Sequence, residues 1–175
     1  PAPPAVWLPL SQHIGAPAIP VVQPGDSVVK GQLVAEASGA ISANVFSGVC
    51  GRVKAIEEIA NPMGLKQKYI VIENDGRNEE TRFPNLESFD DKSIIDRGRE
   101  AGIVGLGGAG FPTAVKLTPK NPLDTRVVNG AECEPYLNCD SRLMIEHTDE
   151  IVKGINYIAA ALNVKNVVVG IEKNK

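Results

Sequence analysis

Four glycines within the six residues 105–110 form the segment of this sequence best suited to binding a ligand. Glycine accepts positive φ angles and has no side chain to hold a ligand away from the backbone. Pro112 suits the first turn of a helix, and a loop of free N–H groups that leads into a helix N-terminus binds anions such as phosphate. Lys116 would add a positive charge about one helical turn later. We interpret the segment as the phosphate-binding loop of a nucleotide or flavin cofactor; the alternative is a structural turn.

The glycine spacing differs from the two common phosphate-binding motifs. A P-loop needs Gly, four residues and then Gly-Lys-Ser/Thr, whereas Phe111 and Pro112 follow Gly110 here. The run 105–110 fits G-x-G-x-x-G, but that motif should lie between a strand and a helix, and residues 93–101 before it are predicted to be helical. From spacing alone, both interpretations of the loop stay open.

A second polar group follows a short apolar strand that we expect at residues 126–129. It consists of Asn129, Glu132 and Glu134, with Asp140 beyond them. Ligands of open α/β sheets bind at the carboxyl ends of the strands. An asparagine amide suits a flavin ring edge or ribityl chain, whereas the carboxylates suit ribose hydroxyls or a nicotinamide amide rather than phosphate. The alternative is a capping turn before a helix expected at residues 141–146.

The composition excludes several classes of protein. The 175 residues allow one or two domains, and the net charge is −3, from 18 basic and 21 acidic residues. Without a basic run, nucleic acid is not an expected partner. No apolar stretch approaches the roughly 20 residues of a membrane span, and no secretory signal is found. Cys50, Cys133 and Cys139 lack C-x-x-C spacing, so we expect neither disulfides nor a cluster here, and we expect Cys133 and Cys139 to be fairly buried.

The apolar pattern divides the chain into two parts. Residues 1–75 contain short apolar groups separated by turn residues, which predicts an all-β barrel or sandwich. Residues 76–90 are polar and charged and are predicted to be a linker. Residues 91–175 are predicted to be the N-terminal part of an α/β, Rossmann-like domain that is truncated, because only two good strands are present. The lack of a leading methionine before Pro1 also leads us to expect a piece of a longer protein.

The α/β part has specific start and stop signals. Residues 93–101 should form a helix closed by Gly102. A longer helix should be capped by Thr148, carry its apolar residues on one face, and end at Asn163. Residues 167–169 should form a buried strand.

The stretch 24–56 resembles the lipoyl/biotinyl, or barrel-sandwich hybrid, pattern, in which G-D-x-V-x-x-G-Q makes one hairpin. Gly25 and Gly31 would supply its tight turns. A carrier needs a lysine at the tip of the intervening hairpin, and Lys30 lies before that tip. We therefore predict an unmodified module with a docking or structural role, not a carrier of lipoate or biotin.

The two polar constellations together resemble a known family. The glycine-rich run 105–113 with Lys116, followed by Asn129-x-x-Glu132-x-Glu134-Pro135, resembles the FMN- and NADH-binding subunit of respiratory complex I. The sequence is still more similar to the RnfC family, the NADH-oxidising subunits of Rnf electron transport complexes. The features that carry this closer resemblance are Leu106, the residues 129–136, the ending at 170–175 and the barrel module that comes first. The resemblance covers essentially the whole chain.

The resemblance implies roles for individual residues. The FMN phosphate and ring would be lined by Gly105, Gly107, Gly108 and Gly110, with Lys116 near the phosphate. The flavin would form hydrogen bonds with Asn129 and Glu132. Phe111 would pack on the nicotinamide nucleotide, and Glu134 would face that nucleotide. No catalytic side chain and no metal ligand is assigned. Leu106 and Ala131 depart from the complex I pattern, which has arginine and aspartate there, so polar contacts at those positions are not carried over.

The same resemblance implies an activity. NADH would pass a hydride to FMN, which would release single electrons to 4Fe-4S centres in a downstream segment; the cofactor carries the chemistry and the protein positions it. The expected partners are the other subunits of an Rnf complex, with peripheral attachment to the cytoplasmic face of a bacterial membrane. The alternative is a non-catalytic docking or assembly module of that complex.

Overall fold

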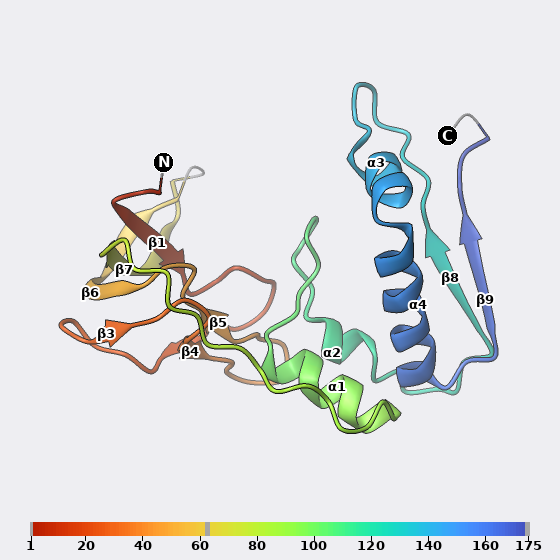
Figure 1. Cartoon of the computed structure of the whole chain (residues 1–175), viewed down its shortest axis with the longest axis horizontal. Coiled ribbons are helices and arrows are strands. Elements are labelled where there is room, and N and C mark those ends of the chain that lie inside the picture. The colour runs from red at the N-terminus through yellow and green to blue at the C-terminus, as the bar shows by residue number, and fades with distance from the viewer. Residues whose placement is uncertain (1, 62–63, 174–175) are drawn as a thin grey trace. The chain divides into compact units, whose positions relative to one another are not determined.

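The computed structural model describes residues 2–61 and 64–173 (Figure 1). The chain divides into two compact units. The first comprises residues up to 85 together with 97–116, and the second comprises residues 86–96 and 117–175. No helix in the described part of the chain is long and apolar enough to cross a membrane. The domain boundaries expected from sequence, at residues 75 and 90, stay a prediction.

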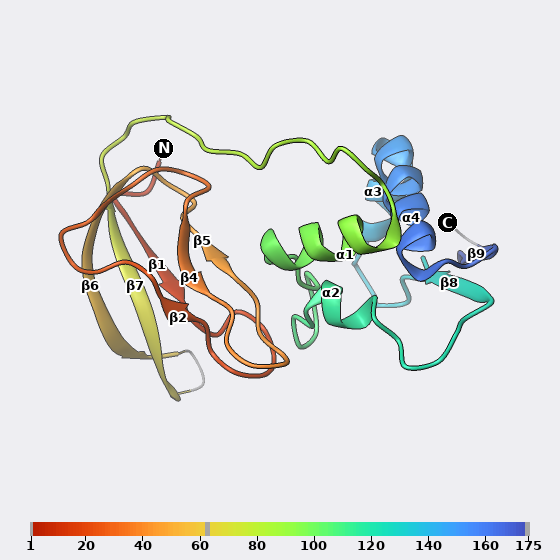
Figure 2. The same cartoon turned by 90° about the horizontal axis from the view of Figure 1, so that it is seen from below.

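Two antiparallel sheets form the barrel of the first unit, packed face to face as two layers (Figure 2). The larger sheet has the order β1-β7-β6-β3, from strands Ala5–Pro9, Lys66–Asn74, Gly51–Ala60 and Ser27–Val28. The smaller has the order β2-β4-β5, from strands Ile19–Pro20, Leu33–Glu36 and Val45–Phe46. This arrangement confirms the predicted all-β module.

The core lies between these two layers. Along β6, Val53 is buried while Arg52 and Lys54 are exposed, which is the alternation of a strand with one face in the core. Val53 meets Val28, Val34 and Ile70 in one cluster whose members are almost completely buried. Burial of each such side chain contributes about 1.5–3 kcal/mol, so this cluster is the main source of stability for the loops attached to the sheets.

Residues 79–83, which we call the strap, continue from β7 and lie along the barrel. The Thr81 N–H donates to the Lys30 carbonyl over 2.9 Å. The buried Cys50 thiol donates to the Glu79 carbonyl, also over 2.9 Å. The ring of Phe83 meets Phe46 edge-on, with centroids 5.8 Å apart. The strap is therefore bound to the barrel by backbone, thiol and aromatic contacts.

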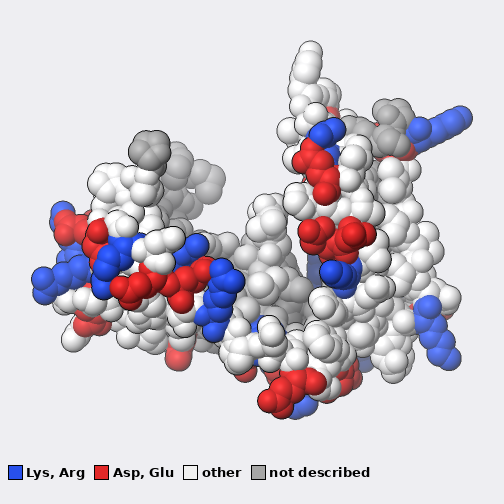
Figure 3. Space-filling view, in the orientation of Figure 1, with Lys and Arg blue, Asp and Glu red and all other residues white. Residues whose placement is uncertain are grey.

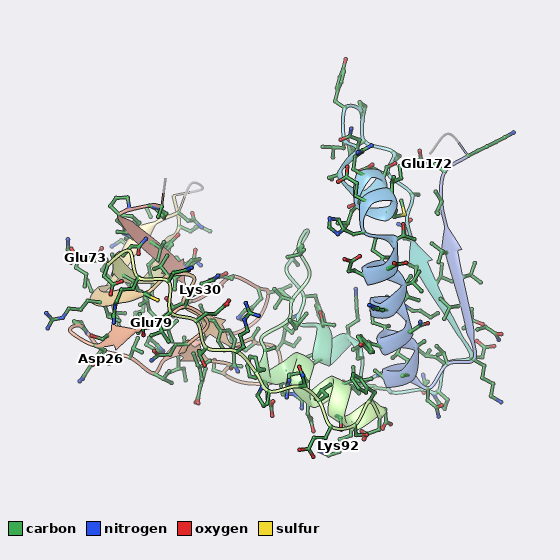
Figure 4. The ribbon with its side chains drawn as sticks, in the orientation of Figure 1. Asp26, Lys30, Glu73, Glu79, Lys92 and Glu172 are labelled. Carbon is green, nitrogen blue, oxygen red and sulfur yellow. The ribbon has the colours of Figure 1, made fainter. Side chains whose placement is uncertain are left out.

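Charged side chains of both signs alternate over the surface of the barrel (Figure 3). Lys30 pairs with Glu80 at 3.4 Å, and Arg77 pairs with Glu79 at 3.2 Å. Lys30 and Glu79 lie on the same side of the barrel (Figure 4). Exposed pairs of this kind contribute little each, so the strap depends mainly on its backbone contacts.

Replacing Gly31 by alanine should detach the strap and destabilise the barrel. Gly31 has φ +80°, and an added Cβ would stand 2.3 Å from the Thr81 carbonyl oxygen. We expect a loss of about 2–3 kcal/mol in urea unfolding. Gly76→Ala is the matched control, since Gly76 has φ +77° but open space around it; it should lose only about 1 kcal/mol. Equal losses in the two variants would contradict the strap contact.

The second unit is built on a strand–helix–strand arrangement. β8, Thr125–Asn129, and β9, Asn166–Gly170, pair in parallel with Thr125 opposite Asn166. Between them come α3, Cys139–Glu146, and α4, Thr148–Leu162. A small core unites the end of α4 with α1, Asp91–Glu100, whose first turns belong to this unit; it consists of Leu117, Ala161 and Leu162 with Ile94, Ile95, Ile158 and Val164. The parallel pair confirms the predicted α/β part.

The two ends of α4 differ in how they are capped. Asn163 ends α4 in the left-handed conformation, with φ 50°, as predicted. Thr148 does not cap α4: His147 holds the N-cap position, and the Thr148 hydroxyl donates back to the Met144 carbonyl over 2.6 Å. The prediction failed because α3 ends at Glu146, only two residues before Thr148, so the last carbonyl groups of α3 offer the Thr148 hydroxyl an acceptor that competes with the N–H groups of α4.

Burial in the second unit also differs from expectation. β9 was predicted to be buried, yet all its residues are exposed, and Val168 keeps 53% of its surface. Among the described residues β9 pairs only with β8, so most of the strand remains open to solvent. Cys133 and Cys139, expected to be fairly buried, are exposed as well.

The carboxyl group of Asp90 should titrate far below the usual range. It accepts hydrogen bonds from the Ser88 and Ser93 hydroxyls and, over 2.8 Å, from the Ser93 N–H in the first turn of α1. These bonds, with Ser88 first, lower the pKa of Asp90 to about 2. At pH values above the ordinary pKa of 3.8, the ionised carboxylate therefore stabilises α1 in full. This stabilisation is lost as the pH falls through about 2.

A carboxyl-carbon NMR titration measures this pKa directly. Ser88→Ala should move the Asp90 midpoint up toward 3.8. Ser27→Ala, at an exposed position on β3, is the control and should leave it unchanged. A wild-type midpoint near the ordinary value would contradict the hydrogen-bond arrangement.

Candidate cofactor site

The glycine-rich segment forms a closed loop within the first unit. Val104 and Pro112 form an isolated antiparallel bridge at its base, and the Gly105 N–H donates to the Phe111 carbonyl over 3.0 Å. At the tip, the Gly110 N–H donates to the Gly107 carbonyl over 3.2 Å. Gly108 and Gly110 both have φ +59°, a conformation that glycine adopts without strain. The glycines therefore allow the tight path of this loop.

The tip of the loop offers backbone donors to a ligand. Among the described residues, the backbone N–H groups of residues 106–109 have no hydrogen-bond partner, and all four residues are exposed. Leu106 projects fully into solvent at the position where the complex I pattern has arginine. Side chains added at Gly107 or Gly108 would meet no atom within 4 Å, so space for a ligand lies beside the backbone.

Helices flank this loop on both sides. α1 precedes it, as predicted, and the short helix α2, Thr113–Lys116, begins directly after Pro112. Lys116 is the last residue of α2 and is exposed. Phe111 is half-buried at the base of the loop. The structure thus brings the predicted glycines, Phe111 and Lys116 together in one unit.

The loop borders a pocket of about 510 Å³. One side is lined by Gly105–Gly110 and the other by Ser11–Ile14, from the loop that follows β1. The Ile14 N–H donates to the Ala109 carbonyl over 2.8 Å, which joins the two sides. Sequence reasoning missed the second side, and His13 was assigned no role, because no local pattern relates residues so far apart in the chain.

The second polar constellation gathers at the end of β8. The Asn129 side-chain oxygen accepts from the Ala131 N–H over 3.0 Å. The carboxylate of Glu132 is buried and accepts from the N–H groups of Asp140, over 2.9 Å, and Ser141, over 3.3 Å. Glu132 thereby caps α3, so the capping turn considered as an alternative is present. Glu134 is exposed. The flavin and nicotinamide contacts expected for these residues stay a prediction.

Glu132, Cys139 and Asp140 lie close enough for their donor atoms to fall within 4.8 Å of one another. Both Glu132 oxygens already accept backbone N–H groups, which leaves them poorly available to a cation. We assign no metal to this cluster. Its electrostatic effect is on the thiol: the Cys139 sulfur lies 3.3 Å from a Glu132 oxygen, and this hydrogen bond raises the pKa of Cys139.

Comparison with known families matches the two parts of the chain separately. Residues 1–77 match the RnfC barrel sandwich hybrid domain, and residues 99–175 match the Nuo51 FMN-binding domain. The fold and the site thus define a barrel-sandwich module joined to part of an FMN-binding domain. The chain belongs to the RnfC family, and similar proteins are named as C subunits of ion-translocating oxidoreductase complexes.

Individual relatives agree with this assignment. The chain is 46% identical to the C subunit of the proton-translocating ferredoxin:NAD(+) oxidoreductase complex of Clostridium ljungdahlii, with 100% of the chain and 40% of the relative covered. It is 48% identical to the C subunit of the ion-translocating oxidoreductase complex of Rhodobacter capsulatus, with 100% of the chain and 35% of that protein covered. For the Pseudomonas aeruginosa relative the identity is 43%, over 96% of the chain and 23% of the relative. The chain therefore spans well under half of each relative.

Glu132→Gln should make Cys139 more reactive. The glutamine keeps one oxygen, which can accept from one of the two backbone N–H groups, and it removes the negative charge that raises the pKa of the thiol. A lower pKa gives more thiolate at neutral pH, so alkylation of Cys139 by iodoacetamide should speed up about two- to tenfold.

Mass spectrometry of the peptide containing Cys139 across a pH series gives this rate. Glu134→Gln is the control, because it removes an exposed carboxylate that is no partner of the thiol. An unchanged rate in Glu132→Gln would contradict the contact between Glu132 and Cys139.

Proposed function

We propose that this chain is the N-terminal part of an NADH-oxidising subunit that passes electrons through FMN to iron–sulfur centres of a membrane-bound, ion-translocating complex of Rnf type. The observation that carries the proposal is the glycine loop, whose exposed amides border a pocket in the region that matches an FMN-binding domain. The names of the relatives, which include subunits of ferredoxin:NAD(+) oxidoreductase complexes, support the same activity.

The donors in the first unit fit FMN. Backbone N–H groups at residues 106–109 suit phosphate or flavin carbonyl oxygens, and Gly107 and Gly108 leave the backbone open to close approach. Lys116 supplies a positive charge for the phosphate. FMN, when bound, supplies the chemistry of accepting a hydride and releasing single electrons. The residues of this chain hold and orient it; no side chain need exchange a proton.

The remaining assigned residues have proposed roles that follow from the resemblance alone. Asn129 and Glu132 would hydrogen-bond the flavin, Phe111 would pack on the nicotinamide nucleotide, and Glu134 would face that nucleotide. Asn129 offers its side-chain N–H₂ group for this purpose, since the oxygen already accepts from Ala131. The exposed Glu134 carboxylate is free to meet ribose hydroxyls or a carboxamide.

The 4Fe-4S centres of the proposed electron path would be held by residues beyond this chain. The partners would be the other members of the complex, because the relatives are named as one component of a larger assembly. We propose that these partners hold the protein peripherally on the cytoplasmic face of the membrane.

A docking role for the barrel is the second candidate function. One observation favours it over a carrier role: Lys30, the lysine nearest to a carrier position, pairs with Glu80, and its backbone binds the strap. A lysine whose backbone is bound to the strap is unsuited to carry a mobile lipoyl or biotinyl arm. Docking of the barrel and flavin chemistry are compatible in one protein.

FMN titration of the full-length protein tests the proposal. Gly108→Val and Lys116→Ala should each weaken FMN binding about tenfold or more, because they distort the loop and remove the phosphate charge. Wild-type protein should bind flavin that is bleached by NADH, as read from the loss of the visible flavin absorbance.

Two controls separate binding from folding. Gly76→Val carries similar backbone strain away from the pocket, and Lys120→Ala removes a neighbouring exposed lysine. Both should bind FMN as the wild type does. A folded full-length protein that binds no FMN would leave the glycine loop a structural turn and favour the docking role.

A further inference from the structure

The wall of the pocket opposite the glycine loop comes from the barrel. Ser11, Gln12, His13 and Ile14 line it. Ser11 is half-buried and Gln12 exposed, and within the described residues their side chains have no hydrogen-bond partner. The residues that line the pocket therefore include a hydroxyl and a carboxamide besides the free N–H groups of the loop, and both groups suit the phosphate, ribityl or ring oxygens of a flavin nucleotide.

Two backbone contacts fix this wall against the loop. The Ile14 N–H donates to the Ala109 carbonyl over 2.8 Å. One residue later, a Cβ on Gly110 would stand 2.8 Å from the Gln12 carbonyl oxygen and 3.2 Å from the His13 Cα. Gly110 is therefore needed for the contact with the barrel, whatever it contributes to a ligand. The two walls meet without room for a side chain between them.

His13 holds the wall from behind. It is only 7% exposed, and its Nε2 lies 3.1 Å from the Ala43 N–H. Nε2 must accept there, so the ring proton is on Nδ1, which donates to the Ile14 carbonyl over 3.1 Å. Ile14 thus accepts from His13 at its carbonyl and donates its N–H to the loop. Ala43 is buried in the barrel, so the ring connects the barrel interior to the pocket.

We infer that the barrel module forms one wall of the FMN site, with His13 as a positioning residue that fixes the Ser11–Ile14 segment against the glycine loop. The inference rests on the proposed function, because it names FMN as the occupant of the pocket. It assigns the barrel a part in cofactor binding in addition to docking. His13 acts through the peptides of Ile14 and Ala109 and does not touch the reacting atoms.

Hydrogen–deuterium exchange of the full-length protein, with and without saturating FMN, tests the wall directly. FMN should slow exchange in two separate segments, residues 11–14 and 105–110, while the turn at residues 23–26 stays unchanged. Protection of 105–110 without 11–14 would overturn the barrel wall and leave the proposed function intact. A folded protein that binds no FMN would overturn both.

Variants at His13 test the positioning role. His13→Ala should weaken FMN binding about tenfold, in the range of other residues that orient a binding group. His13→Gln should recover most of the affinity, because its side-chain oxygen can accept from the Ala43 N–H as Nε2 does. His147→Ala, at an exposed histidine outside the pocket, is the matched control and should bind as the wild type.

Thermal unfolding of each variant separates positioning from loss of fold. The role stands when His13→Ala keeps a cooperative transition of the barrel and loses affinity that glutamine restores. Wild-type affinity in His13→Ala would overturn it. Equal losses in the alanine and glutamine variants would also overturn it, since they would trace the effect to packing of the ring rather than to the bond with Ala43.

Discussion

The candidate site depends on the close approach of two backbone segments that are almost a hundred residues apart in sequence. Gln12 and His13 of the barrel lie against Gly110, where no side chain has room, and Ala109 accepts the Ile14 N–H beside this contact. The approach fixes the loop at Ala109 and Gly110, while the backbone N–H groups of residues 106–109 have no partner among the described residues. A loop with one fixed end and free amides is pre-organised for an anion, which reduces the entropy that binding must remove.

The barrel is stable enough to act as the support. Its core of almost fully buried aliphatic residues lies between two sheets, and the loop that carries His13 is attached to β1 of the larger sheet. The strap adds a second set of contacts, through Lys30, Cys50 and Phe46. These contacts hold the barrel and its attached loops in one arrangement, which suits a support.

Local signals in the sequence predicted much of the fold but little of the long-range packing. The turns at Gly25 and Gly31 and the end of α4 at Asn163 follow from φ angles that few residues adopt, so composition reveals them. The glycine loop and the polar residues after β8 were found by type and spacing. The buried His13, the strap and the capping role of Glu132 depend on residues far apart or on a turn geometry that spacing does not encode. Thr148 was misassigned because a neighbouring helix end competed for its hydroxyl.

The pairing of β1 with β7 has a consequence for biosynthesis. Ala5 lies opposite Glu73, so the first strand of the barrel has no partner in its sheet until nearly the whole module has been made. At roughly 5–20 residues per second, a nascent chain spends several seconds with this strand unpaired outside the ribosome. Trp7, half-exposed even in the finished sheet, is then fully accessible at an open edge. The interval before β7 emerges is therefore the period in which chaperones have most to protect.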